Sequence, residues 1–218
     1  MTNGSTGIWK LILVPSLITL AVTVVRLIGE LNHWNETFFR RAAGGAGAVV
    51  GIVWLAFIFA IYFALKVHCS GAALPGAGKA FLWTLVAFAV FVGGEFLQYG
   101  GIQSHSTFKV AAGVIAVVIA ILIMRMAWPS YWTVLTAYAL AARIPVTIIA
   151  FFALRGAWGT HYDAIPPEFA SFGFAAQFLY LAVMPQLTFW VAFTVILCGL
   201  FGIVAGAVAK GRACPAAA

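Results

Sequence analysis

The sequence predicts an all-α fold: a polytopic transmembrane helical bundle of about six membrane-spanning helices, with one interfacial or re-entrant helix before the last span. Hydrophobic residues make up 64% of the chain and charged residues 8%, where a soluble domain has about 25% charged residues. Uncharged runs longer than the roughly 20 residues that cross a bilayer recur along the chain. The clearest runs from Ala42 to Leu65, between Arg41 and Lys66. No linker or repeat divides the chain, so residues 1–218 are expected to form a single integral membrane domain.

The expected spans follow the uncharged runs in order. The first five cover about Ile8–Ile28, Ala42–Leu65, Ala80–Tyr99, Val110–Trp128 and Tyr131–Leu154. Pro129 separates the fourth from the fifth, because proline cannot continue a helix that precedes it. The uncharged stretch Phe169–Ala209 is too long for one crossing and barely long enough for two. Pro185 divides this stretch, so we expect an interfacial or re-entrant helix before Pro185 and a sixth span over about Gln186–Val208.

Six crossings would distribute the charged residues unevenly. We call side A the side that holds the N-terminus and side B the opposite side. Side A receives basic residues only, namely Lys10, Lys66, Lys79, Arg125, Lys210 and Arg212. Side B receives the five carboxylates, Glu30, Glu36, Glu95, Asp163 and Glu168, together with five lysine or arginine residues. The count of basic residues predicts a cytoplasmic N-terminus in a plasma or inner membrane. A second crossing by residues 169–209 would reverse this orientation.

Composition also bounds the partners. The net charge is +7, but the basic residues stand singly at the ends of apolar runs, which favours anionic membrane lipids over nucleic acid. Cys69, Cys198 and Cys214 are widely separated and form no CxxC pair, so we expect neither a disulfide framework nor a bound metal. No phosphate-binding, dinucleotide-binding or haem-ligating pattern occurs, and no cofactor is expected.

Arg143 stands near the middle of the fifth span. An arginine at that depth costs roughly 2.5 to 3.5 kcal/mol on insertion scales, so such residues usually face the interior of a bundle and mark a substrate or ion pathway. Thr136 and Thr147 lie seven residues before it and four after, on the same helical face. This stripe predicts a polar lining. The alternative is a structural ion pair in which Glu95 or Glu30 neutralises Arg143.

Glu95 is a second candidate near the end of the third span. It follows two glycines and precedes Gln98 by one helical turn, which places a carboxylate and an amide on one face. A buried carboxylate of this kind could relay protons or bind a cation. The alternative is that Glu95 lies at the membrane surface and is simply solvated.

The most polar segment runs from Arg155 to Glu168. It is a candidate loop or gate over a side-B cavity, with candidate residues Arg155, Trp158, His161, Tyr162, Asp163 and Glu168. His161 and Asp163 are residue types that could ligate a metal or act as acid and base, but their spacing matches no zinc or hydrolase signature. The alternative is structural, since Trp158 and Tyr162 are suited to the headgroup level of a membrane.

Small residues at helical spacing suggest close helix packing. Gly47 with Gly51, and Gly202 with Gly206, form GxxxG patterns that let backbones approach one another. We expect these patterns to pack helices within the chain. They are also candidate contacts for a homo-oligomer or for partner membrane subunits.

Three hypotheses about function remain open at this point. The first is a small transporter, channel or solute- or lipid-binding membrane protein with a polar pocket near Arg143 and Glu95. The second is a non-catalytic accessory or scaffolding subunit of a larger complex. The third is a membrane-embedded enzyme that acts on a lipid or its headgroup, which ranks last because no nucleophile motif accompanies the polar residues.

Overall fold

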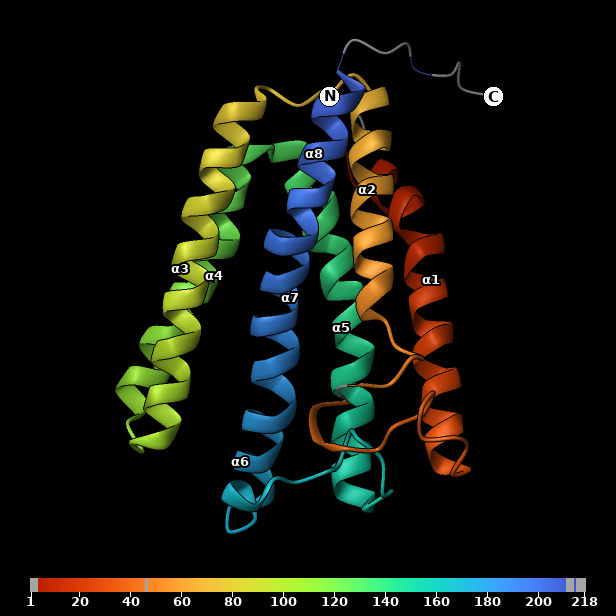
Figure 1. Cartoon of the computed structure of the whole chain (residues 1–218), viewed down its shortest axis with the longest axis vertical. Helices are drawn as coiled ribbons and strands as arrows, with labels where there is room; N and C mark the ends of the chain where they lie inside the picture. The colour runs from red at the N-terminus through yellow and green to blue at the C-terminus, as the bar shows by residue number, and fades with distance from the viewer. Residues whose placement is uncertain (1–3, 46, 211–213, 215–218) are drawn as a thin grey trace.

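The structure is a computed structural model that describes residues 4–45, 47–210 and 214. It consists of long helices running up and down a single bundle (Figure 1). The first helices are α1 (Gly4–Leu31), α2 (Val53–Cys69), α3 (Ala77–Gln103), α4 (Thr107–Ala127) and α5 (Pro129–Gly156). A last helical stretch, Phe174–Ala209, contains α6 (Phe174–Phe178), α7 (Trp190–Ala192) and α8 (Gly199–Ala209). Two single 3-10 turns, Ala43–Gly45 and Pro167–Phe169, lie in the loops.

The prediction of a helical membrane bundle is confirmed. Five helices are long and apolar enough to cross a bilayer, and α2 is a shorter apolar helix. Large hydrophobic side chains lie on the outside as well as in the core: Leu13, Val14 and Leu17 on α1 are each about half exposed. A water-soluble protein of this size would not expose so much contiguous apolar surface, whereas lipid tails solvate it.

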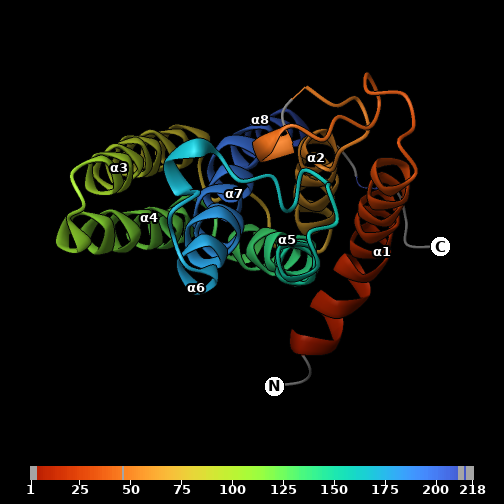
Figure 2. The same cartoon turned by 90° about the horizontal axis from the view of Figure 1, so that it is seen from below.

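The helices pack mainly as neighbouring pairs. Figure 2 shows α3 beside α4 at one end of the bundle, α1 at the other end, and α2, α5, α7 and α8 between them. In the α3–α4 pair, a Cβ added to Gly94 would lie 3.0 Å from the carbonyl oxygen of Gly113, so the two backbones touch there. Dispersion contacts of this kind hold helices together in lipid, where the hydrophobic effect between helices is lost.

The second span differs from the sequence-based expectation. A single helix over Ala42–Leu65 was expected, but α2 begins only at Val53. Gly44, Gly45 and Gly47 have φ of 72°, 66° and 82°, a left-handed backbone that ends helical geometry. The apolar composition of the run predicted a single spanning helix, but the glycines within it decided the conformation of its first part.

The last stretch also differs from the expectation, because Pro185 does not divide it. The helix continues from Phe174 to Ala209, and π-helical turns cover Leu179–Val183, Pro185–Phe189 and Phe193–Cys198. Pro185 stands at the junction of two of these stretches, where the wider turn leaves room for a ring that would clash within an α-helix. Within the described part of the chain, no separate interfacial helix precedes Phe174–Ala209, which is long and apolar enough to form one span.

The helix directions support the expected distribution of charge. The upper ends of the helices in Figure 1 carry Lys66, Lys79, Arg125 and Lys210. These are side A residues, and Arg212 lies outside the described residues. The segments that hold Glu36, Asp163 and Glu168 lie at the lower ends in Figure 1, and Glu30 and Glu95 lie toward the lower ends of α1 and α3.

The prediction that the cysteines form no disulfide framework is wrong for one pair. A disulfide joins Cys69, at the end of α2, to Cys214, whereas Cys198 is a buried free thiol. The two bonded residues are 145 positions apart in sequence. Sequence spacing gave no signal for this bond, because it depends on both residues lying at the same end of the bundle.

Candidate functional site

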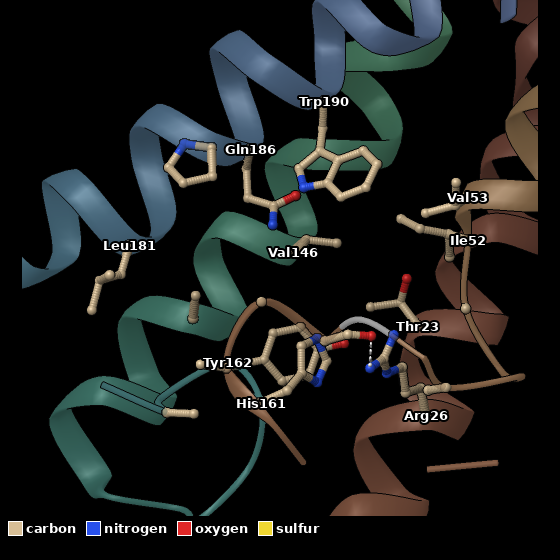
Figure 3. A pocket seen from close by; sticks show the side chains of 18 of the residues that line it. Thr23, Arg26, Ile52, Val53, Val146, His161, Tyr162, Leu181, Gln186 and Trp190 are labelled. Atoms are coloured by element: carbon tan, nitrogen blue, oxygen red, sulfur yellow. Dashed lines mark hydrogen bonds between the residues drawn. The ribbon is translucent and has the colours of Figure 1, made fainter. Parts of the chain in front are cut away.

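A cavity of about 580 Å³ lies inside the bundle between α1, α5, the last helix and two loops. Figure 3 shows Gln186 and Trp190 on one side of it, His161, Tyr162 and Arg26 on another, and Ile52 and Val53 at its edge. The lining extends from the middle of α5 to the side-B loop that contains Ala164 and Pro166. The cavity is therefore built from segments far apart in sequence.

Glycines allow the loop before α2 to approach the cavity closely. A Cβ on Gly45 would lie 2.6 Å from the His161 ring and 2.8 Å from Nη2 of Arg26. A Cβ on Gly47 would lie 2.9 Å from the Arg40 guanidinium. Gly47 and Gly51 both line the cavity, so this GxxxG pattern belongs to a loop and not to a helix seam.

Arg143 lies in the wall of this cavity. Arg143 stands at the middle of α5, and the residue is only 4% exposed. One guanidinium nitrogen, Nη1, donates to Oε1 of Gln186 at 3.3 Å, and the guanidinium carbon lies 4.7 Å from the centre of the Trp190 ring. An amide oxygen and an aromatic face stabilise a guanidinium without neutralising its charge.

Neither expected carboxylate reaches Arg143. Glu30 forms an ion pair with Arg26 and a hydrogen bond with His161, whereas Glu95 accepts a hydrogen bond from Nε2 of Gln98 at 3.2 Å. Among the described residues, the only other ion pair joins Arg41 to Glu36. The structural ion pair considered for Arg143 is thus absent from the described part of the chain. Its charge faces the cavity without an acidic partner.

Glu30 is the centre of a second polar cluster. Its carboxylate is fully buried and accepts from Nε of Arg26 at 2.8 Å, from the backbone N–H of His161 at 2.9 Å and from Nδ1 of His161 at 2.6 Å. Arg26 also donates through Nη2 to the carbonyl oxygen of Gly45 at 2.9 Å. This cluster holds α1, the glycine loop and the loop after α5 together at the side-B end of the cavity.

The loop after α5 presents two aromatic rings to the cavity. His161 and Tyr162 have ring centres 3.8 Å apart. Burial lowers the pKa of His161, opposed by its hydrogen bond to Glu30, so the ring is neutral at pH 7 and Nδ1–H donates to the carboxylate. Burial also raises the pKa of the Tyr162 hydroxyl, which stays protonated. Arg143 and Arg26 are therefore the charged side chains that line this cavity. Glu30 does not line it but pairs with Arg26.

Asp163 has a structural role in the same loop. Its carboxylate accepts from the backbone N–H groups of Gly159 at 2.8 Å and Thr160 at 2.7 Å, and from the Thr160 hydroxyl at 2.6 Å. These bonds close a tight turn and occupy the carboxylate. No group of three or more histidine, cysteine or acidic side chains that could hold a metal occurs within residues 4–45, 47–210 and 214.

The remaining predicted residues lie outside the cavity wall. Glu95 and Gln98 are on α3, away from the cavity that Arg143 lines. Thr147 donates its hydroxyl to the Arg143 carbonyl oxygen at 3.0 Å, and Thr136 is not part of the lining. Val146 and Ala150 share the cavity face of α5 with Arg143 instead. Arg155, Trp158 and Glu168 are exposed loop or helix-end residues that do not line it.

Sequence analysis did not identify four residues that shape the site. Arg26 and Glu30 stand four residues apart near the end of the first expected span, and Gln186 and Trp190 lie within the last one. Pro185 was the available signal for the last pair, because a proline within a helix at membrane depth often marks a cavity. No local pattern indicates that Glu30 meets His161, since the two are 131 residues apart.

Comparisons of this chain with protein families, with curated proteins and with solved structures found no match. The function is therefore inferred from the geometry of the site.

Proposed function

We propose that this integral membrane protein binds an anionic solute in the cavity beside Arg143, as a small transporter, channel or solute- or lipid-binding protein. The observation that carries the proposal is a guanidinium, 4% exposed, that lines a cavity and has no carboxylate partner among the described residues. A buried charge without a counter-ion is costly, and a ligand that supplies the opposite charge removes that cost.

The position of the cavity supports a role in solute binding. Its lining begins at mid-membrane with Arg143 and Trp190 and ends at the side-B loop. The residues around the charge are held in place, because the Gln186 amide and the Trp190 ring contact the guanidinium from the last helix. A pre-formed cavity with few polar groups on apolar walls is the usual form of a small-molecule site.

Replacing Arg143 by Gln tests this proposal. The glutamine keeps a polar side chain but removes the positive charge, so binding of anionic solutes should weaken by about tenfold or more, as expected for loss of a charge-assisted hydrogen bond. The measurement is ligand-dependent thermal stabilisation of the purified protein across a panel of carboxylates, phosphate esters and neutral analogues. Uptake into proteoliposomes, measured with the same compounds, separates transport from binding.

Arg125→Gln is the matched control. Arg125 also lies over a tryptophan, 5.7 Å from the ring centre of Trp132, but it is exposed at the side-A end of α4. This variant should bind anions as the wild type does. Equal binding by a folded Arg143→Gln variant and the wild type would overturn the proposed function.

A further inference from the structure

The second membrane crossing is interrupted at the cavity. Helix α2 has 17 residues, which span roughly 25 Å and fall short of the about 30 Å hydrocarbon layer. Figure 1 shows that α2 begins well above the lower ends of α1 and α5, with the glycine loop continuing below it. Non-helical backbone at this depth is tolerated where it lies within protein or lines a cavity. Gly51 and Ile52 in this segment line the cavity.

The start of α2 is an uncapped helix N-terminus that faces the cavity. Its N-cap residue is Ile52, which has no side-chain oxygen to accept from the first N–H groups. Ile52, Val53 and Trp54 all line the cavity. The partial positive charge of the helix dipole is concentrated at such an end, and free N–H groups there bind anions.

Arg143 is a second, independent feature of the same cavity that favours an anion. It is more than nine-tenths buried, has no acidic partner among the described residues and lines the same cavity from α5. Interrupted helices in membrane transporters place their N-termini at anionic groups of a substrate in this way.

The charge balance of the cavity favours a ligand with a single negative charge. Arg26, the other cation in the lining, is compensated by Glu30 at 2.8 Å. His161 donates to the same carboxylate and adds no net charge in its neutral form. One guanidinium and one helix end therefore remain to be neutralised.

The wall also contains apolar side chains that suit a hydrocarbon or aromatic body. Val146, Leu181, Trp190 and Trp54 all line the cavity that Arg143 lines. At about 580 Å³ the cavity is large enough for a small organic molecule.

We infer that the ligand is a monoanion with an apolar body, whose negatively charged oxygens bind between the N-terminus of α2 and Arg143. This inference rests on the proposed function and adds to it the ligand class and a second anchor. The apolar body lies against Val146, Leu181 and Trp190. A free carboxylate and an anionic lipid headgroup share this chemistry.

Binding of radiolabelled octanoate to the full-length protein in a non-ionic detergent tests the ligand class. Octanamide keeps the chain without the charge, acetate keeps the charge without the chain, and succinate carries a second charge. Octanoate should bind about tenfold or more tightly than each of them. Equal binding of octanamide would overturn the inference. Displacement of octanoate by phosphatidylglycerol would assign a lipid as the source, and lack of displacement would assign a free carboxylate.

Ile52→Asp tests the helix N-terminus separately from Arg143. An aspartate at the N-cap accepts from the first N–H groups and supplies its own negative charge, so octanoate affinity should fall by about tenfold or more while α2 is better capped. Ile52→Asn caps without charge and should lose less affinity. All variants are compared by size-exclusion profile and circular dichroism, so that loss of binding is not confused with unfolding.

The combined results distinguish this inference from the proposed function. If Arg143→Gln loses octanoate binding and Ile52→Asp binds as the wild type does, the helix N-terminus is not an anchor and the inference is overturned, while the proposed function stands. If neither variant affects binding of any anion, both fail.

Discussion

At the scale of single residues, the most constrained group is the Glu30 carboxylate. It is fully buried, and three N–H groups from Arg26 and His161 point at it. A buried ion pair of this kind adds little net stability by itself, but loss of one partner leaves the other charge buried and unpaired. The cluster also joins the first helix to the loop after α5, so its disruption should affect the side-B end of the cavity.

Replacing Glu30 by Gln should destabilise the protein strongly. The change leaves the Arg26 guanidinium, whose side chain is 11% exposed, without its counter-ion. The expected cost is about 3–5 kcal/mol, measured by reversible unfolding in mixed micelles.

Glu36→Gln is the control for this change. Glu36 pairs with Arg41 at 3.2 Å but its side chain is 73% exposed, so the cost should be about 0–1 kcal/mol. Equal destabilisation by the two variants would contradict the role assigned to the buried cluster.

His161 should make stability depend on pH. Burial places its pKa in the folded protein below the value of about 6.5 that it has when unfolded. As pH falls below about 6.5, His161 takes up a proton in the unfolded chain before it does so in the folded protein, and the free energy of unfolding falls. The total loss is about 1.4 kcal/mol for each unit between the two pKa values of His161. Arg26, Glu30 and Asp163 are the charged groups that act on the ring.

Thermal unfolding between about pH 8 and about pH 5.5 measures this effect. His161→Asn places an amide nitrogen near the position of Nδ1 and cannot titrate in this range. The variant should lose less stability on acidification than the wild type. A parallel decline in both proteins would assign the pH dependence to other groups.

At the scale of elements, the sequence predicted the long spans well. Uncharged length is a strong signal, because lipid excludes charges from a helix wherever they lie on it. The same signal misplaced the start of α2 by eleven residues, from Ala42 to Val53. Hydropathy is insensitive to the left-handed backbone of Gly44, Gly45 and Gly47. It also could not indicate that π-helical turns would carry the last helix past Pro185.

The candidate site was predicted only in part, because the sequence shows a charge within an apolar span but does not show how the helices pack. Arg143 could be identified because a charge within an apolar span is visible in the sequence. Gln186 and Trp190 are ordinary residues in an apolar helix, and only the packing of that helix against α5 brings them to the guanidinium. Glu95 is equally visible in the sequence, but α3 carries it away from the cavity.

The glycine loop before α2 gives a prediction at this scale. Gly45→Ala should reduce both stability and ligand affinity, because φ is 66° and the added methyl group would contact His161 and Arg26. Gly71→Ala is the matched control, with φ of 87° but open space around the added atom.

The left-handed backbone alone should cost about 1–2 kcal/mol in the Gly71→Ala variant. Gly45→Ala should cost more than that and should weaken anion binding, whereas Gly71→Ala should leave binding unchanged. Unfolding and octanoate binding measured side by side test the difference. Identical behaviour of the two variants would show that the loop does not position the cavity.

At the scale of the whole molecule, two features bear on orientation and point in opposite directions. The count of lysine and arginine residues favours side A as the cytoplasmic side by six to five, a small difference. The Cys69–Cys214 disulfide lies on side A, and disulfides persist in oxidising compartments such as the periplasm or the cell exterior. The disulfide is the stronger indication, because one basic residue fewer on side A or one more on side B would make the two counts equal.

The packing of the molecule also bears on association with other chains. Gly202 and Gly206 are buried within the bundle, where a Cβ would collide with Tyr131 and with Trp128 respectively. Gly47 and Gly51 lie in the cavity loop. These four glycines thus serve contacts within the chain. Association through them with a second copy or a partner subunit stays a prediction.

The disulfide predicts that side A faces outward and that the cavity opens toward the cytoplasm. Single cysteines introduced as Ala73→Cys, in the side-A loop after α2, and Ser171→Cys, in the side-B loop before α6, test this in a background without the native cysteines. Both positions are exposed. An impermeant maleimide should label Ala73→Cys in intact cells and Ser171→Cys only after permeabilisation. The reverse pattern would place the disulfide in the reducing cytosol, where it would not persist, and would make the count of basic residues the better guide.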